Sequence, residues 1–504
     1  MPRFDGPEHL AHETPIRSLL ETTFAALDGR VESADALYER VTRAEAWRQP
    51  DGARGIVPFA VKSGLVVRLV GPAGRMLEVS LGDLSPTEAR LRLDEALAVL
   101  AVQPEGKARL APLVDRERRH FGPPVGLPDG PTLAVRWGAL LDAIERRVTE
   151  LTPAGVRLNH RVRAYAQIEE KVVADVDGLW RTQSLPQCFV QVEFQAVREP
   201  ARARFVTRFG EIAGIDALVA PDGTLGSGFA ERLSEGVTRV LRLLQARALT
   251  PEEKKKLSHY VLDASAMVFI HEACGHNFEA DIIQQGTSGL FHPDGSPVDA
   301  LLGSPAVQLI DGPPVDASGR VLRNQGFGTQ HIDDEGVEVE TIVLLDRGRV
   351  AHLMHNRETA GQFGVGSNGR GFSELGQPRL VRMTNTYLLP SEPSFLTGDL
   401  GTFLRDVRLG VWLEGSNGGE VTGDGMSTTI QLGRLIRDGV LTDEWLLPCT
   451  LSVQTRGALK TVEGFYGTPS LDRVGFCGKG QTKTVTSGGC AARLGVTDAI
   501  SLAW

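Results

Sequence analysis

The chain has 504 residues, a formal net charge of −9, 41% hydrophobic residues and 23% charged residues. These values are ordinary for a soluble globular protein, and they exclude disordered, collagen-like and disulfide-stapled chains. The length indicates two or three domains, since a domain has roughly 150 residues. Because the acidic balance leaves no basic excess for phosphate groups, we expect neither nucleic acid nor a membrane surface as a partner.

The cysteines indicate the cellular compartment. They are odd in number, far apart and without a Cys-x-x-Cys pair: Cys188, Cys274, Cys449, Cys477 and Cys490. This usage is typical of reduced thiols and not of a disulfide framework. The first residues contain no apolar signal segment, and no run approaches the roughly 18 consecutive apolar residues of a membrane span. We therefore expect a cytoplasmic protein.

The first half of the chain alternates between helical and strand patterns. Apolar and polar residues alternate at 161–168 and 190–196, which predicts strands with one solvated face and hence an antiparallel or mixed sheet. In chain order the patterns predict a helix at about 16–46, strands at 64–70 and 76–80, a helix capped by Ser85 that runs to Leu100, a helix at 135–151, the two strands just named, and a helix at 227–248.

The composition changes near residue 248. Thr250 starts a short capped helix, and the segments 283–330 and 359–427 are rich in Gly, Ser, Asn, Asp and Pro. Between these segments, residues 337–345 alternate as a strand and residues 346–349 form a hairpin turn. We predict an α+β fold with two domains. An N-terminal mixed α/β domain comprises residues 1–248, and a β-rich C-terminal domain comprises residues 249–504 around one helix.

One segment of the C-terminal half carries residues of catalytic type. An apolar run leads directly into the pattern His271-Glu272-x-x-x-His276. The familiar zinc-protease helix has its two histidines four residues apart on one face, whereas five residues leave them about 140° apart on a regular helix. The spacing therefore predicts an irregular helix that ends, bends or widens into a π turn. Gly275 is the residue type that permits such a distortion.

This segment could support metal chemistry. Neutral His271 and His276 would bind zinc with a third ligand from elsewhere in the chain, and Glu272 would accept the proton of the zinc-bound water. The alternative is a buried, hydrogen-bonded histidine pair. Glu279 and Asp281 favour the metal site, because carboxylates often orient ligating histidines, although such acids are also ordinary on surfaces.

The segment from His271 to Asp281, followed by Gly-Thr-Ser at 286–288, resembles the signature of the TldD/PmbA metalloproteases. Three further stretches are similar to elements of that family in the same order: Asp333 to Gly336, Arg382 to Thr386, and Cys477 to Gln481, the last being one residue shorter. The resemblance covers about residues 262–490. It implies a zinc-dependent peptidase of the TldD type, the subunit that carries the metal motif.

The resemblance also implies the ligand set. In that family the metal ligands are the two histidines and the cysteine of the last element, which here are His271, His276 and Cys477, with Glu272 as the general base. A thiolate is a good zinc ligand, and the neighbouring Lys479 would favour deprotonation of this cysteine. Cys490 is the competing third ligand, since it also follows a glycine-rich stretch.

Substrate and assembly follow from the same resemblance. The family pairs a chain with the metal motif and a related chain without it, and the pair admits extended, unfolded peptides that add as a β-strand to a sheet edge. We therefore expect a homodimer, or a heterodimer with such a chain, and a substrate that is a small peptide or a biosynthetic peptide precursor. The alternatives are a zinc hydrolase of a non-peptide amide and a catalytically silent subunit that binds peptides or regulates a partner.

Three loops, 333–336, 361–371 and 382–385, are candidates for substrate contact. They contain the predicted contact residues Asp333, Asp334, Glu335, Arg382 and Asn385. Buried turns with satisfied polar groups are an equally good interpretation of these loops. The sequence departs from the family at Gly371, in the stretch 414–420 and after Gln481, which leaves the metal motif intact but bears on the choice of substrate and partner.

Overall fold

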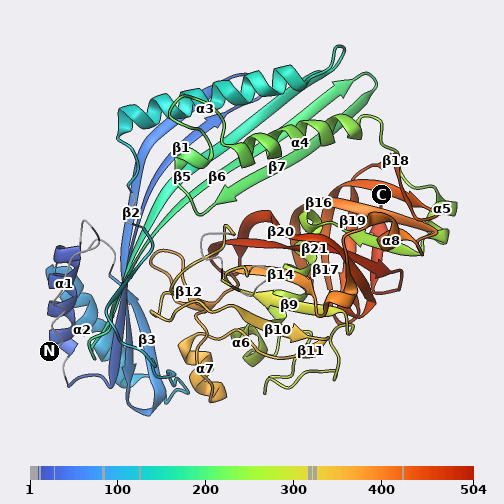
Figure 1. Cartoon of the computed structure of the whole chain (residues 1–504). Helices are drawn as coiled ribbons and strands as arrows, with labels where there is room; N and C mark the ends of the chain where they lie inside the picture. Colours follow the sequence, from blue (N-terminus) through green and yellow to red (C-terminus); the bar gives the residue numbers. More distant parts are fainter. Residues whose placement is uncertain are drawn as a thin grey trace.

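The computed structural model describes residues 10, 13–27, 29–81, 86–123, 126–315, 320–321, 326–422 and 425–504. Figure 1 shows two parts, a sheet of long strands flanked by helices and a β-rich part that contains the C-terminus. The fold is α+β, as predicted. The domain boundary predicted at residue 248 falls in the connection between α4 (Ser227–Leu243) and α5 (Pro251–Lys256).

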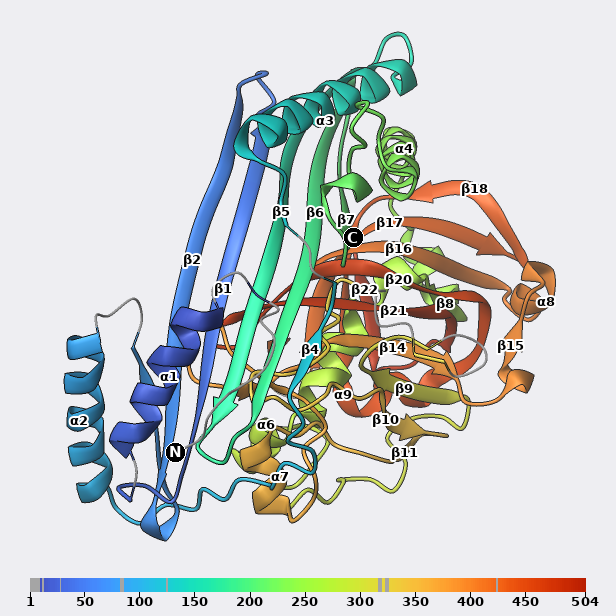
Figure 2. The same ribbon diagram turned by 60° about the vertical axis from the view of Figure 1, so that its left-hand side comes forward.

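The first part is built on one sheet with the strand order β3-β2-β1-β5-β6, to which β4 and β7 add by pairing with β6. Its long strands stand side by side in Figure 2. The elements up to α4 are α1 (Glu13–Leu27), β1 (Ser33–Arg48), β2 (Arg54–Gly71), β3 (Arg75–Ser80), α2 (Pro86–Val102), β4 (Arg119–Phe121), α3 (Gly130–Leu151), β5 (Arg157–Asp175), β6 (Trp180–Arg198) and β7 (Ala201–Glu211).

The helix predicted at 16–46 is wrong beyond Leu27. Residues 33–48 form β1, which pairs antiparallel with β2 on one side and with β5 on the other. The segment contains many good helix formers, but helix propensities differ by less than about 1 kcal/mol per residue, so backbone pairing on both edges and burial in a sheet outweigh them. The capping role predicted for Ser85 lies outside the described residues.

Helices cover the long strands at both ends. Near one end, α3 and α4 bury a core that includes Trp137, Phe194 and Phe229, and near the other end α1 and α2 pack around Phe24 and Trp180. Burial of apolar surface stabilises the protein by about 25 cal/mol per Å², so packing holds these helices more than their intrinsic propensity does. In the part of the chain that the structure describes, no helix is long and apolar enough to cross a membrane.

The second part contains a large sheet with the order β11-β10-β9-β14-β21-β8-β16-β17-β19-β22, to which β20, β15 and β18 add. The capped start predicted at Thr250 is confirmed by a capping box with Glu253, and the hairpin predicted around residues 346–349 is confirmed as β10 and β11. The elements after α5 are β8 (His259–Leu262), α6 (Ala280–Gln284), β9 (Val307–Asp311), β10 (Ile342–Asp346), β11 (Arg349–Val350), α7 (Arg357–Phe363), β12 (Gly371–Phe372), β13 (Leu380–Val381), β14 (Asn385–Pro390), β15 (Leu396–Thr397), α8 (Leu400–Leu404), β16 (Leu409–Thr422), β17 (Gly425–Arg437), β18 (Val440–Leu446), β19 (Cys449–Gln454), α9 (Thr455–Ala458), β20 (Val462–Gly478), β21 (Thr482–Gly495) and β22 (Ile500–Ala503).

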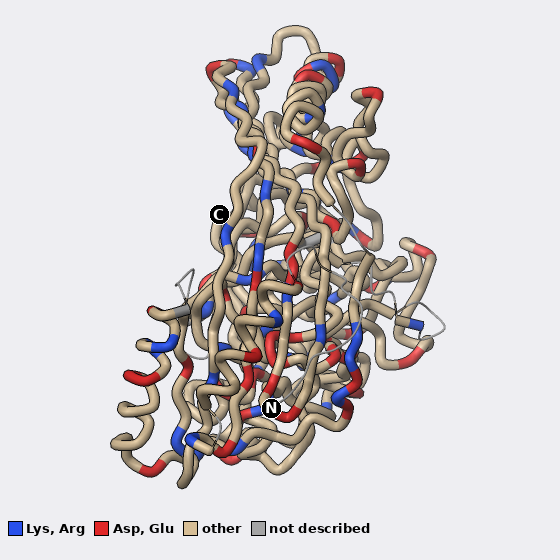
Figure 3. The backbone as a smooth tube through the Cα atoms, turned by 90° about the vertical axis from the view of Figure 1, so that its left-hand side faces the viewer, with Lys and Arg blue, Asp and Glu red and all other residues tan. Residues whose placement is uncertain are grey.

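Buried ion pairs join the two parts. On the long strands, which carry charges of both signs in Figure 3, Arg68 pairs with Asp35 and also with Glu335 of the second part. Lys171 of β5 lies 2.7 Å from Asp334 of the second part. Loss of one partner from such a pair leaves an uncompensated buried charge. These pairs therefore favour one orientation of the sheet against the β-rich part.

Candidate metal centre

The His-Glu-x-x-x-His segment is an irregular helix, as its spacing predicts. Residues Ile270–Cys274 form one π turn, and a 3-10 turn at Gly275–Phe278 follows at once. The wider turn absorbs the extra residue and brings the ring centroids of His271 and His276 to 5.0 Å from each other.

The role predicted for Gly275 is wrong. Its backbone has an ordinary right-handed helical conformation, with φ −53° and ψ −52°. A Cβ atom at this position would lie 2.1 Å from Sδ of Met383. Packing against the side chain of Met383 therefore favours glycine here, and the backbone conformation does not require it.

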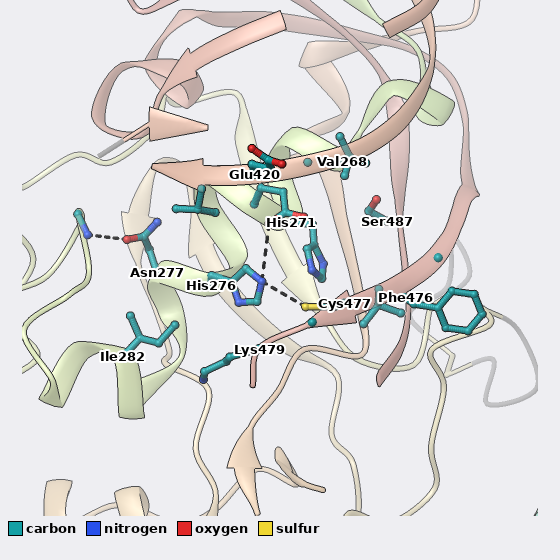
Figure 4. A pocket seen from close by; sticks show the side chains of 18 of the residues that line it. Val268, His271, His276, Asn277, Ile282, Glu420, Phe476, Cys477, Lys479 and Ser487 are labelled. Atoms are coloured by element: carbon teal, nitrogen blue, oxygen red, sulfur yellow. Dashed lines mark hydrogen bonds and ion pairs between the residues drawn. The ribbon is translucent and has the colours of Figure 1, made fainter. Parts of the chain in front are cut away.

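Three candidate ligands come together from two distant segments. One ring nitrogen each of His271 and His276 and Sγ of Cys477 lie within 4.8 Å of one another. The sulfur lies 3.3 Å from Nε2 of His276, and Figure 4 shows it on β20 beside the two rings. Cys490 is not part of this group. Its Sγ lies 3.8 Å from the carbonyl oxygen of Gly467 instead.

The chemistry of these side chains fits a metal ion. Both ring nitrogens of His271 are buried and have no hydrogen-bond partner among the described residues. Such atoms are costly unless another group meets them. Burial alone would raise the pKa of Cys477, but His271 and His276 outweigh it and lower that pKa to about 4. Two imidazoles and a thiolate form a ligand set that suits zinc.

The carboxylate of Glu279 fixes the orientation of the His276 ring. Oε2 of Glu279 lies 2.8 Å from Nδ1 of His276. Burial opposes ionisation of Glu279, but His276 and Lys479 lower its pKa to about 2, so the carboxylate accepts the hydrogen bond and Nε2 is left towards the sulfur. Nζ of Lys479 lies 3.0 Å from Glu279 and 2.7 Å from Asp281. The cation predicted to act on Cys477 is therefore paired with carboxylates, and the two histidines lower the pKa of the thiol instead.

The cluster opens into a cavity of about 990 Å³. Glu272 lines the same cavity, with Oε2 at 3.8 Å from Nε2 of His276. Residues 418–421 of β16 also line it, and a Cβ atom on Gly419 would lie 2.7 Å from Cγ of Glu272. The sequence does not mark this strand as part of the site, because its glycine-rich stretch is typical of a loop and no local pattern indicates a cavity wall.

The predicted substrate-contact residues are all buried: Asp333, Asp334, Glu335, Arg382 and Asn385. Among the described residues that line the metal cavity, none of the five occurs. Arg382 donates hydrogen bonds to the carbonyl oxygens of Cys477 and Gln481, so it holds the β20–β21 turn that carries the sulfur. Contact between these residues and a substrate stays a prediction.

Two imidazoles, a cysteine sulfur and a neighbouring carboxylate meet at an open cavity, and the imidazoles and the sulfur form a group that could hold a metal ion. The model of the family described as "PmbA/TldA metallopeptidase C-terminal domain" matches residues 257–477. This part of the chain is therefore similar to the TldD/PmbA metallopeptidases.

Curated relatives match part of the chain, and a solved structure has a similar fold. A metalloprotease of Methanothermobacter thermautotrophicus is 37% identical over 230 residues, which cover 45% of this chain and 46% of the relative. A zinc metalloprotease TldD homologue of Saccharolobus solfataricus is 27% identical over 228 residues, covering 44% of this chain and 46% of the relative. In these matches the chain spans about half the length of the curated relatives. The fold is similar to that of TldE from Thermococcus kodakarensis, with a TM-score of 0.71 and 13% identity over 96% of this chain and 100% of that one.

Proposed function

We propose that this chain is a zinc-dependent peptidase that hydrolyses peptide bonds in small or unfolded peptides. The observation that carries the proposal is the convergence of His271, His276 and Cys477 beside Glu272 at the wall of one cavity. Zinc is named for one relative, and the donor set of two imidazoles and a thiolate supports the same ion here. The complete ligand set argues against a catalytically silent subunit.

The residues of the site have three roles: metal ligands, a general base and a carboxylate that orients one ligand. His271, His276 and Cys477 would hold zinc, which when bound lowers the pKa of a coordinated water to about 7. Glu272 lies beside the cluster, accepts the proton of the attacking water and delivers it to the leaving amine. Glu279 keeps the Nδ1 proton of His276 engaged, so that Nε2 of the ring faces the metal position.

Strand β16 supports a substrate that is bound through its backbone. Residues 420–421 pair with β17 on one edge, while β8 pairs with the other edge only at residues 410–413. Beyond that point the described residues give β16 no strand partner on its second edge, and this section lines the cavity. An extended peptide can add to such an edge, which explains recognition with little dependence on side chains.

The partner chain and the compartment stay predictions. Either a second copy of this chain or a related chain without the metal motif would complete the assembly, and light scattering by the purified chain distinguishes self-association from a monomer. A cytoplasmic location agrees with five free cysteines in the structure.

The test compares the wild-type chain with Glu272→Gln. Both proteins are analysed for zinc and incubated with mixed unfolded peptides, and the products are identified by mass spectrometry. We expect one zinc per chain in both and a loss of about 100-fold or more in the cleavage rate of the variant, since general-base catalysis contributes about 10²–10⁴-fold.

Glu252→Gln is the matched control, because this glutamate is exposed on α5 and, among the described residues, its one ion pair is with the surface residue Lys255. It should cleave at the wild-type rate. Full activity of a zinc-loaded Glu272→Gln protein would contradict the general-base role. A wild-type chain that binds no zinc would contradict the proposed function itself.

A further inference from the structure

A second cavity adjoins the metal cavity. It has a volume of about 670 Å³, in the usual range for small-ligand sites, and it is lined by residues of β1 and β5 from the first part and by residues of the β20–β21 hairpin from the second. Phe476 lines both cavities, and Figure 4 shows its ring directed away from the sulfur of Cys477. A peptide bound at the metal centre would therefore pass this ring to enter the second cavity.

The second cavity contains a lysine without an ion pair. Lys483 of β21 is 9% exposed and lines the cavity wall. Across the described parts of the chain its ammonium group makes no ion pair and no hydrogen bond, although Glu169 and Asp334 attract it electrostatically. Its one ring contact there is with Phe372, whose centroid lies 3.9 Å from Nζ. A buried amine without an ion pair is costly, and an arriving anion would supply the missing partner.

The same cavity also contains a buried acid, whose charge would be opposite to that of Lys483. Glu39 of β1 is 7% exposed, and its Oε2 is buried without a partner in the described residues. Burial, and then the neighbouring Glu169, raise the pKa of Glu39 to about 8, although Lys171 and Lys483 attract its charged form. Lys171, the cation opposite Glu39 across the β1–β5 pair, lies 2.7 Å from Asp334 and 3.0 Å from Glu169, so other carboxylates already share it.

One kind of ligand would satisfy both groups. Buried acids and bases are normally paired, and an unpaired one keeps its neutral form at a cost in free energy. A molecule with an ammonium group and a carboxylate would provide a partner for Glu39 and a partner for Lys483. A peptide provides this combination at a chain end, either as an acidic N-terminal residue with its free amine or as a basic C-terminal residue with its free carboxylate.

We propose that this second cavity binds the zwitterionic end of a peptide, whose ammonium group meets Glu39 and whose carboxylate meets Lys483. The inference rests on the proposed peptidase function, because it assigns the cavity to the substrate of the adjoining metal centre. It adds a charge-specific contact at one chain end to the backbone recognition along β16. Peptides with a matching end are therefore bound more tightly than peptides with blocked ends.

Binding to the metal-free full-length Glu272→Gln protein tests this without any turnover. Three probes are titrated by calorimetry: glutamyl-alaninamide, which has an N-terminal ammonium and a side-chain carboxylate; acetyl-alanyl-lysine, which has the reverse arrangement; and acetyl-alanyl-alaninamide, which has neither charge. We expect one of the first two to bind at least about tenfold more tightly than the third, since hydrogen bonds to charged groups exceed neutral ones by this order. The tighter probe identifies the end that is bound.

Variants assign the binding to the cavity. Lys483→Met and Glu39→Gln, made in the same metal-free background, should each weaken the preferred probe by about tenfold or more. Lys483→Met removes a buried amine that has no ion pair, and Glu39→Gln replaces a buried carboxyl group by a neutral group of nearly the same shape, so neither should lower the thermal stability of the protein. Lys460→Met is the control, since this lysine lies on the surface and pairs with Asp299.

Equal binding of the three probes, or tight binding that survives both cavity variants, would overturn the inference. These results do not depend on zinc or on Glu272. Failure of the terminal-binding site is therefore distinguishable from failure of the proposed peptidase function, which is measured by zinc content and cleavage.

Discussion

Replacement of Glu279 by glutamine tests how the fold prepares His276 as a ligand. The carboxylate lies 2.8 Å from Nδ1 of His276 and is itself held 3.0 Å from Nζ of Lys479. Glutamine has nearly the same shape but no charge, so the ring loses a charge-assisted hydrogen bond and its preferred tautomer. Carboxylate partners of this kind account for about 10–100-fold in metal affinity, or about 1.4–2.8 kcal/mol. We expect a loss of zinc affinity in that range.

The assay is competition for zinc against a chelator at pH 7, with the fold of each metal-free protein checked by circular dichroism. Glu463→Gln is the matched control, because Glu463 also lies beside a histidine, His259 at 3.2 Å, but at a 41% exposed position. Lys479→Met keeps the Glu279–His276 hydrogen bond and should lose less affinity than Glu279→Gln. An unchanged zinc affinity in a folded Glu279→Gln protein would refute the reasoning.

Two further predictions concern the thiol and the buried charges. In the metal-free protein Cys477 should be the first cysteine to react with iodoacetamide at pH 6, because its pKa is about 4 while burial raises the pKa of the other four cysteines. Bound zinc should prevent this reaction. Peptide mapping that found another cysteine modified first would contradict the prediction. Arg68→Met should lower the free energy of unfolding in denaturant by about 3–5 kcal/mol, compared with a small change for Arg30→Met at an exposed pair. Burial would raise the pKa of Asp35, but Arg68, Arg379 and Arg357 lower it below its ordinary value. The ionised carboxylate therefore stabilises the protein at a pH above its unfolded pKa of about 3.9, and this contribution disappears as the pH falls through the lower folded value. Equal acid sensitivity of the wild type and Arg68→Met would count against this pairing.

The metal motif could be predicted from the sequence because its geometry is local. The five-residue step from His271 to His276 required an irregular helix, and the π turn at Ile270–Cys274 confirms it. Cys477 follows His276 by 201 positions, so only a family resemblance could propose it. The choice between Cys477 and Cys490 became visible only when the packing of β20 brought one sulfur to the rings and left the other beside Gly467.

In the first half of the chain, long-range strand pairing outweighs the local sequence pattern. Residues 33–46 have the composition of a helix, yet they form the centre of a sheet, because partners more than a hundred positions away supply the second edge. The same distant pairing places Glu39 opposite Lys171 and leaves it facing the cavity that contains Lys483.

By itself the sequence determined the α+β class, most helices and several strands of the first half, one hairpin of the second half, and the two histidines and glutamate of the metal motif. These features depend on the periodicity, capping and spacing of neighbouring residues, which a continuous segment contains in full. Only the tertiary structure decided the strand nature of β1, the packing reason for Gly275, the partner of Lys479 and the second cavity. Each of these depends on side chains from separate segments, whose contacts and burial outweigh local preference once the chain has folded.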